Sequence, residues 1–155
     1  MRRIIAYLVR FAAILVGYAV AALAASAFLN VLFLGHFGYA PEPGHPTIAP
    51  ALYFSVPFIA LFVAYFGFMP AAAVILIAEV LGRRDWLFYA LGGAIIAVIF
   101  LGFAHNIGDG EFDVTDNNVR LALIGSGMVG GIFYWLSAGR WAGTWRREPL
   151  PDPES

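Results

Sequence analysis

Two side chains of opposite charge lie inside long apolar stretches of the sequence. Arg10 is near the start of the first stretch and Glu79 is near the end of the second. An ionisable residue inside a membrane-spanning segment is a candidate for proton or ion transfer. Because consecutive spanning helices run antiparallel, we expect Arg10 and Glu79 at the same membrane boundary, where they could meet. Arg83 follows Glu79 by four residues, a spacing that also favours a helical ion pair.

We therefore predict an interfacial ion pair, with the Arg10 side chain extending toward the lipid headgroups. The alternative is that Glu79 is a proton or cation site.

A proline within the second stretch is the next candidate. Pro70 lies in FGFMPAA, at 66–72, close to Gly67. Proline removes a backbone hydrogen-bond donor and can bend a helix. We expect a kink at Pro70 that helps the helices to pack. The alternative is a broken helix that lines a cavity, as in transporters.

The stretch IGSGMVGG, at 124–131, matches the pattern G-x-G-x-x-G. In a dinucleotide-binding fold this turn joins a strand to a helix in water, whereas here it interrupts a continuous apolar run. The spacing instead favours close packing of membrane helices through small residues, either inside the bundle or against another protein. The small residues that we expect at helix contacts are Gly17, Ala21, Ala25, Gly92, Gly93, Ser126, Gly127, Gly130 and Gly131.

Several candidate metal ligands fall in two loops of the sequence. They are His36, Glu42, His45, His105, Asp109, Glu111, Asp113 and Asp116. Their spacing matches no zinc motif, and DGEFDVTDNN lacks the glycine at position six of a calcium-binding loop. The chain has no cysteine, which excludes disulfides and thiolate ligands. We expect a solvated acidic loop, with neither a metal nor a cofactor.

The composition indicates the environment of these residues. Of the 155 residues, 61% are hydrophobic and 12% are charged, whereas a water-soluble domain carries about 25% charged residues. The deficit disappears if the outer surface faces lipid. The net charge of −1 gives no indication of a nucleic-acid partner.

Four apolar stretches are long enough to cross a bilayer core of roughly 30 Å, which takes about 20 helical residues. They run over 4–34, 51–81, 86–104 and 119–138. Apolar residues occur all round each stretch rather than on one face. The sequence therefore predicts an all-α bundle of four transmembrane helices over 1–145, followed by a flexible tail over 146–155.

The arginines predict the orientation of the bundle. Only Arg120 falls on one side of the expected membrane; the other side has Arg2, Arg3, Arg10, Arg83, Arg84, Arg140, Arg146 and Arg147. The positive-inside rule makes this second side cytoplasmic, so that both termini are inside.

Aromatic residues gather at the same boundary. Tyr7, Tyr89 and Tyr134 are expected in an aromatic belt with the tryptophans, because such rings prefer the headgroup layer. The residues that we expect to anchor the chain to lipid headgroups are Trp86, Trp135, Arg140, Trp141, Trp145, Arg146 and Arg147.

Two blocks of the sequence resemble a group of small bacterial inner-membrane proteins of unknown function. The blocks are AEVLGRRDWLFYALGG, at 78–93, and GGIFYWLSAGRWAG, at 130–143. The resemblance implies a bacterial inner membrane and a plan of four helices, and it supplies no catalytic residues.

Taken together, these features predict a non-enzymatic accessory or scaffolding subunit that packs against partner helices, or against a second copy, through small-residue faces. The alternative is a small homo-oligomeric transporter or channel that uses the Pro70 kink and the Arg10/Glu79 pair. A third, weaker hypothesis is a membrane enzyme that acts on lipid or quinone at the tryptophan-rich face.

Overall fold

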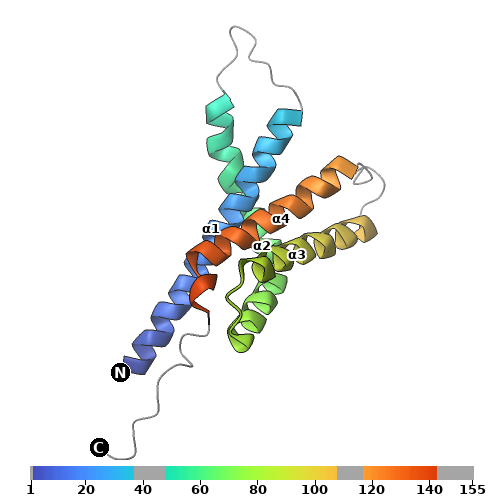
Figure 1. Cartoon of the computed structure of the whole chain (residues 1–155). Helices are drawn as coiled ribbons and strands as arrows, with labels where there is room; N and C mark the ends of the chain where they lie inside the picture. The colour runs from blue at the N-terminus through green and yellow to red at the C-terminus, as the bar shows by residue number, and fades with distance from the viewer. Residues whose placement is uncertain (1, 37–47, 108–116, 143–155) are drawn as a thin grey trace, which may run out of the picture.

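The chain folds into long helices, as the computed structural model in Figure 1 shows. The structure describes residues 2–36, 48–107 and 117–142. Within them, four α-helices are followed by a short 3₁₀ helix: α1 (Arg2–His36), α2 (Ile48–Leu81), α3 (Trp86–Ile107), α4 (Asn117–Ser137) and η1 (Gly139–Trp141). The predicted all-α class is confirmed.

Each α-helix contains a stretch long and apolar enough to cross a membrane. In the described part of the chain these stretches are Ile4–Phe33, Leu52–Leu81, Trp86–Phe103 and Asn117–Ser137. They agree closely with the four predicted spans. By helix length and hydropathy, the chain is a multi-pass membrane protein.

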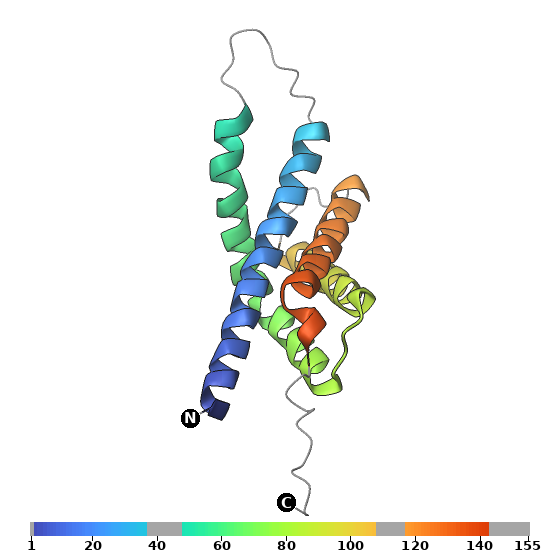
Figure 2. The same cartoon turned by 60° about the vertical axis from the view of Figure 1, so that its left-hand side comes forward.

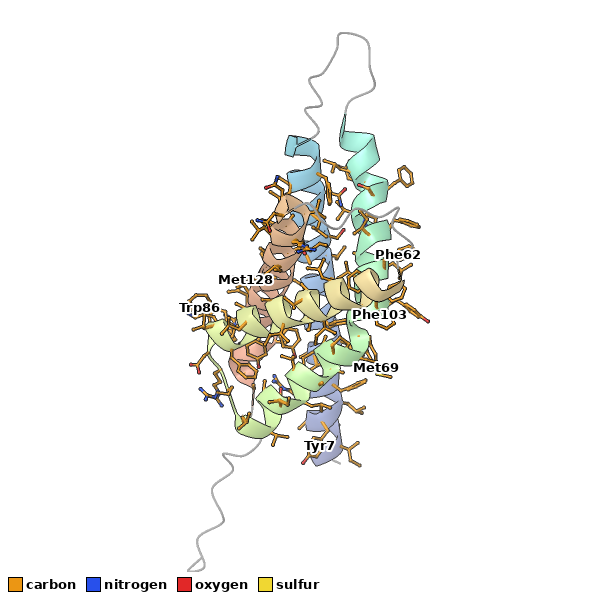
Figure 3. All side chains as sticks on the ribbon, turned by 90° about the vertical axis from the view of Figure 1, so that its right-hand side faces the viewer. Tyr7, Phe62, Met69, Trp86, Phe103 and Met128 are labelled. Carbon is orange, nitrogen blue, oxygen red and sulfur yellow. The ribbon has the colours of Figure 1, made fainter. Side chains whose placement is uncertain are left out.

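The helices pack in the order α2, α1, α4, α3. The most extensive contacts join α3 to α4 and α4 to α1, whereas α2 packs mainly on α1 and touches α3 only lightly. In Figures 1 and 3, α3 runs across the direction of α1 rather than alongside it. The interface between α2 and α3 is therefore the loosest of these neighbouring contacts.

The helix α2 remains continuous through both of its prolines, Pro57 and Pro70. It changes direction near Met69, where its lower half turns away from α1 (Figures 2 and 3). A proline ring displaces the carbonyl four residues earlier and supplies no backbone donor, which accounts for a bend at Pro70. The helix is bent at the predicted place but is not broken into two.

Gly82 ends α2 and begins the turn to α3. Its φ is +63°, in the left-handed region that favours glycine. The Gly82 amide donates to the Glu79 carbonyl (3.4 Å) and the Arg83 amide donates to the Ala78 carbonyl (3.0 Å). This pair of bonds is a Schellman motif. It fixes the last turn of α2, and with it the position of Glu79.

Polar side chains join α1 to the upper half of α2. The Ser26 hydroxyl donates to the Val56 carbonyl at 2.6 Å, and Ser26 is fully buried. One turn later, the Ser55 hydroxyl donates to the Asn30 side-chain oxygen at 2.6 Å. Hydrogen bonds of this kind hold membrane helices in register, because lipid offers the same groups no partner.

Replacing Ser26 by Ala should lower the free energy of unfolding by about 1 kcal/mol, because the bond to α2 is lost. Ser126→Ala is the matched control. Ser126 is also buried, but its hydroxyl donates to the Leu123 carbonyl of its own helix at 2.7 Å, so its loss should change little. Unfolding by denaturant in detergent micelles measures both variants. Equal losses would show that the Ser26 bond does not join the helices.

Candidate functional site

The first polar site joins three elements at one end of the bundle. One terminal nitrogen of Arg10, Nη2, forms an ion pair with Oε1 of Glu79, and Nη1 donates to the Ala138 carbonyl at 3.4 Å. Arg10 thereby links α1 to the lower half of α2 and to the residue that follows α4. The side chains of Arg10 and Glu79 are 19% and 13% exposed. We call Arg10, Glu79, Tyr89, Tyr134 and Ala138 the polar junction.

Two tyrosines bury their rings beside this ion pair. Tyr89 and Tyr134 are 3% and 4% exposed, and their ring centroids are 5.3 Å apart. They form a core cluster with Ile75, Ala78 and Ala138. Both were predicted in an aromatic belt facing the headgroups; the structure buries them between helices instead.

The hydroxyl groups of these two tyrosines differ in their partners. The Tyr89 hydroxyl lies within hydrogen-bond distance of the Arg83 carbonyl (3.3 Å) and the Gly139 carbonyl (3.5 Å). In the described part of the chain, the buried Tyr134 hydroxyl and Nε of Arg10 have no hydrogen-bond partner. Glu79 and Arg10 both lie within electrostatic range of Tyr134. The junction therefore holds two unused donor groups close to a neutralised charge pair.

The turn between α2 and α3 is fastened to the end of α4. Nε of Arg84 donates to the Ala142 carbonyl at 2.9 Å, and the Trp135 indole donates to the Arg84 carbonyl at 2.5 Å. Trp135 also packs against the core cluster. Its indole group is thus used inside the chain, although the sequence predicted a headgroup anchor. Arg83, which the sequence paired with Glu79, contacts the exposed Asp85 at 3.4 Å.

The remaining predicted anchors are divided between exposed and undescribed residues. Trp86 and Trp141 are about half exposed, and the Arg140 guanidinium lies 4.1 Å from the centre of the Trp141 ring. Trp145, Arg146, Arg147 and the tail 146–155 lie outside the described residues.

The small residues lie at contacts within the chain. An added Cβ atom at Gly93 would meet the Gly127 backbone, and one at Gly131 would meet the Tyr89 backbone, closer than real Cβ atoms approach. These glycines let α3 and α4 come together. The helix α4 also packs closely on α1. A Cβ atom at Gly17 of α1 would lie 2.7 Å from Ala138, the residue after α4, and a Cβ atom at Gly130 of α4 would lie 3.3 Å from Ala25 of α1.

The other small residues complete these contacts. A Cβ atom at Gly92 would lie 2.7 Å from Val74 of α2, and a Cβ atom at Gly130 would lie 3.2 Å from the Ala21 carbonyl oxygen. Ser126 is buried in α4. The small-residue faces that the sequence offered for either internal or external packing are thus engaged inside the bundle.

A cavity of about 100 Å³ lies between the four helices. Tyr18, Tyr89 and Tyr134 line it, together with the small residues of α1 and α4. Gly67 and Ala71, which flank the bend at Pro70, form part of the α2 wall. The cavity is partly open rather than enclosed, and it shares Ile75, Tyr89 and Tyr134 with the core cluster.

The candidate metal ligands cannot be placed. His45, Glu42 and the acids of the 109–116 loop lie outside the described residues, and so do the side chains of His36 and His105. Among the residues that the structure does describe, no group of three or more His, Asp or Glu side chains is placed to hold a metal ion.

Compared with protein-family models, curated proteins and solved structures, the chain shows no match.

Proposed function

We propose that the chain is a non-enzymatic accessory or scaffolding subunit of a bacterial inner membrane, with both termini in the cytoplasm. The arginines support this orientation. Arg10 and Arg84 bond to the carbonyls of Ala138 and Ala142 at the same end of the bundle, and Arg140 lies between those two positions in the sequence. The positive-inside rule makes an arginine-bearing end cytoplasmic.

The observation that carries the accessory role is an exposed tyrosine on α2. Tyr65 lies close to the middle of the span Leu52–Leu81 and is 77% exposed. Its ring contacts Phe66, at a centroid distance of 5.2 Å, but the described part of the chain gives its hydroxyl no partner. A hydroxyl without a partner is unfavourable in hydrocarbon. A helix of another membrane protein that accepts this hydrogen bond would remove the penalty.

The same face of α2 carries a row of exposed aromatic rings. Phe58, Phe62 and Phe66 follow one another along α2 with ring centroids 5.1 and 6.3 Å apart. All three are at least half exposed. Because the small residues of this chain pack internally, we place the partner contact on this aromatic face of α2, which is a change from the small-residue faces of the sequence-based hypothesis.

Purification in mild detergent tests the proposal. The protein should bring down one other membrane protein in a fixed ratio, measured by native mass spectrometry. Tyr65→Phe keeps the ring but removes the hydroxyl, and it should reduce the bound partner several-fold, because a hydrogen bond inside the membrane is lost.

Tyr53→Phe is the matched control. Tyr53 is 80% exposed on the same helix but lies beside the end of the span, where its hydroxyl reaches the polar layer. This variant should keep the partner. A wild-type protein that purifies alone, or a partner lost equally in both variants, would contradict the proposal.

The second candidate function is a small homo-oligomeric transporter. One observation favours it: the residues on either side of the Pro70 bend, Gly67 and Ala71, line the cavity. In this alternative, the Arg10/Glu79 pair would take part in the transfer of a proton or a cation.

A further inference from the structure

The acidic residues in the described part of the chain are both engaged by arginines at one end of the bundle. These acids are Glu79 and Asp85. Glu79 is paired with Arg10 inside the bundle, and Asp85 lies 3.4 Å from the exposed Arg83. No further acidic side chain of the described residues is therefore available to the other arginines at this end.

Arg84 is one of the arginines left without an acidic partner, and it is held in one position. Its Nε atom donates to the Ala142 carbonyl at 2.9 Å, and its own carbonyl accepts a hydrogen bond from the Trp135 indole. Its terminal nitrogens, Nη1 and Nη2, have no partner in the described part of the chain. They are accessible, in contrast to the buried Nε of Arg10.

Arg140 lies close to this group, on the helix η1. It precedes Ala142, the partner of Arg84, by two residues. Its side chain is exposed, and its guanidinium lies 4.1 Å from the centre of the Trp141 ring. Contact with an aromatic ring leaves the N–H donors of a guanidinium available to another acceptor. Two guanidinium groups with unused donors therefore lie beside η1.

Both of these arginines lie just beyond the apolar spans. The spans of α2 and α4 end at Leu81 and Ser137, and that of α3 begins at Trp86. Each arginine is within three residues of one of these positions. Trp86 and Trp141 are about half exposed at the same end, and tryptophan rings prefer the headgroup layer of a membrane. The free donors are therefore at the depth of lipid headgroups.

The chemistry of this pair favours an anionic phosphate group. The planar guanidinium donates two N–H groups at once to phosphate oxygens. A zwitterionic headgroup would also bring an ammonium group, and the described part of the chain has no free carboxylate to receive it. A headgroup with a net negative charge leaves no such cation unpaired.

The surface next to the pair favours a lipid over a free phosphate ion. Leu87 of α3 and Leu136 of α4 are both nearly half exposed, and they lie within the spans, close to the same end. Acyl chains can cover these side chains while the phosphate remains at the arginines. A phosphate ion in water makes no use of this apolar surface.

We propose that Arg84 and Arg140 bind the phosphate of one anionic phospholipid. Both guanidinium groups donate to the phosphate oxygens, and the acyl chains lie along the exposed apolar side chains of α3 and α4. The site is more specific than the headgroup anchoring expected from the sequence, because it includes Arg84 and selects the charge of the headgroup. It does not depend on whether the aromatic face of α2 binds a partner helix.

Native mass spectrometry of the detergent-purified full chain tests this site. The first equivalent of phosphatidylglycerol should bind saturably, and phosphatidylethanolamine with the same acyl chains should bind about fivefold more weakly or less tightly still. Inorganic phosphate at the same concentration should not displace the lipid. Equal affinity for the two lipids, or displacement by inorganic phosphate, would overturn the proposal.

Two substitutions examine the arginines themselves. Arg140→Gln and Arg84→Gln should each lower the affinity for phosphatidylglycerol about fivefold, because each removes one charge and its donors from the phosphate. Arg83→Gln is the matched control. It removes the same charge from the same turn, but Arg83 is already engaged by Asp85, so the affinity should change by less than about twofold.

Size-exclusion elution and circular dichroism show whether each variant is folded. If Arg84→Gln fails to fold without its bond to Ala142, the exposed Arg140→Gln still decides the question. Wild-type affinity in a folded Arg140→Gln protein would overturn the proposal. An equal loss in Arg83→Gln and Arg140→Gln would also overturn it, because the lipid would then respond to the general surface charge rather than to this site.

Discussion

Replacing Glu79 by Gln should lower the free energy of unfolding by about 3 kcal/mol. Glu79 is paired with Arg10 where α1, α2 and the end of α4 meet, and both side chains are mostly buried. Without the carboxylate, the Arg10 guanidinium keeps its charge inside the bundle but loses its counter-charge. Removing one partner of a buried pair is costly because the remaining charge is uncompensated.

The expected loss depends on charge rather than on hydrogen bonding alone. Glutamine retains a side-chain oxygen that can still accept from Nη2 of Arg10, so a hydrogen bond can survive the substitution. Asp85→Asn is the matched control. Asp85 is 66% exposed and lies 3.4 Å from the exposed Arg83, so its loss should change stability by less than about 1 kcal/mol.

A double substitution separates the pair from its individual charges. Arg10→Met combined with Glu79→Leu removes both charges, and the double variant should be more stable than either single variant. The Ala138 carbonyl retains a partner in that protein, because the Trp141 amide donates to it at 3.3 Å. Denaturant unfolding in micelles provides the free energies for this double-mutant cycle.

Two results would contradict this structural role. The first is a double variant that loses as much stability as the two single variants together. The second is proton flux into proteoliposomes that Glu79→Gln abolishes while the protein remains folded, which would favour the transporter alternative.

The sequence predicts the helices well, because length and hydropathy decide them. The Arg10/Glu79 contact is also predictable. Two opposite charges at the same boundary of antiparallel spans have few other partners, and ionisable residues in spans tend to pair. The bend at Pro70 follows from one residue type. Each of these features depends on local composition, or on which end of a helix a residue occupies.

The burial of Tyr89 and Tyr134 is a different kind of property. Their place near one end of the spans is visible in the sequence, but which way each ring faces depends on the rotation of its helix. Helices that are apolar all round carry no periodic signal for that rotation. The cavity and the unpartnered Tyr134 hydroxyl were missed for this reason.

The polar contact between α1 and α2, formed by Ser26, Asn30 and Ser55, was missed for a related reason. Small polar residues scattered in apolar spans look like any other small residues until the partner helix is known. Their bonds depend on the register of α1 against α2, which neither helix encodes alone. Ser26 and Asn30 recur one turn apart in the first span, and this spacing is the signal that could have indicated the contact.

Replacing Gly93 by Ala should cost at least about 3 kcal/mol, although only a methyl group is added. The new Cβ atom would overlap the carbonyl of Gly127 in α4. The obstacle is backbone, which cannot rotate away as a flexible side chain does, so α3 and α4 must separate. Overpacking a tight contact usually costs about 1–3 kcal/mol and occasionally more. We expect Gly93→Ala at the upper end of this range or above it, because the overlap is with backbone.

Gly102→Ala makes the same change on the same helix and is the control. Outside its own helix backbone, no atom of the described residues lies within 4 Å of its added Cβ, so the variant should be unchanged or slightly more stable, because alanine favours a helix over glycine. Unfolding in detergent micelles measures both variants. The difference between them isolates the effect of contact with α4 from the effect of helix propensity.

Gly127→Ala extends the comparison to the opposite helix. Its Cβ would overlap the Gly93 carbonyl, so both substitutions force apart the same pair of helices. Once Gly93→Ala has separated the two helices, Gly127→Ala adds less further overlap. The double variant should therefore lose less free energy of unfolding than the sum of the two single variants. Additive losses would mean that the glycines act at separate contacts. An unchanged Gly93→Ala protein would mean that α3 and α4 are not in close contact at this position.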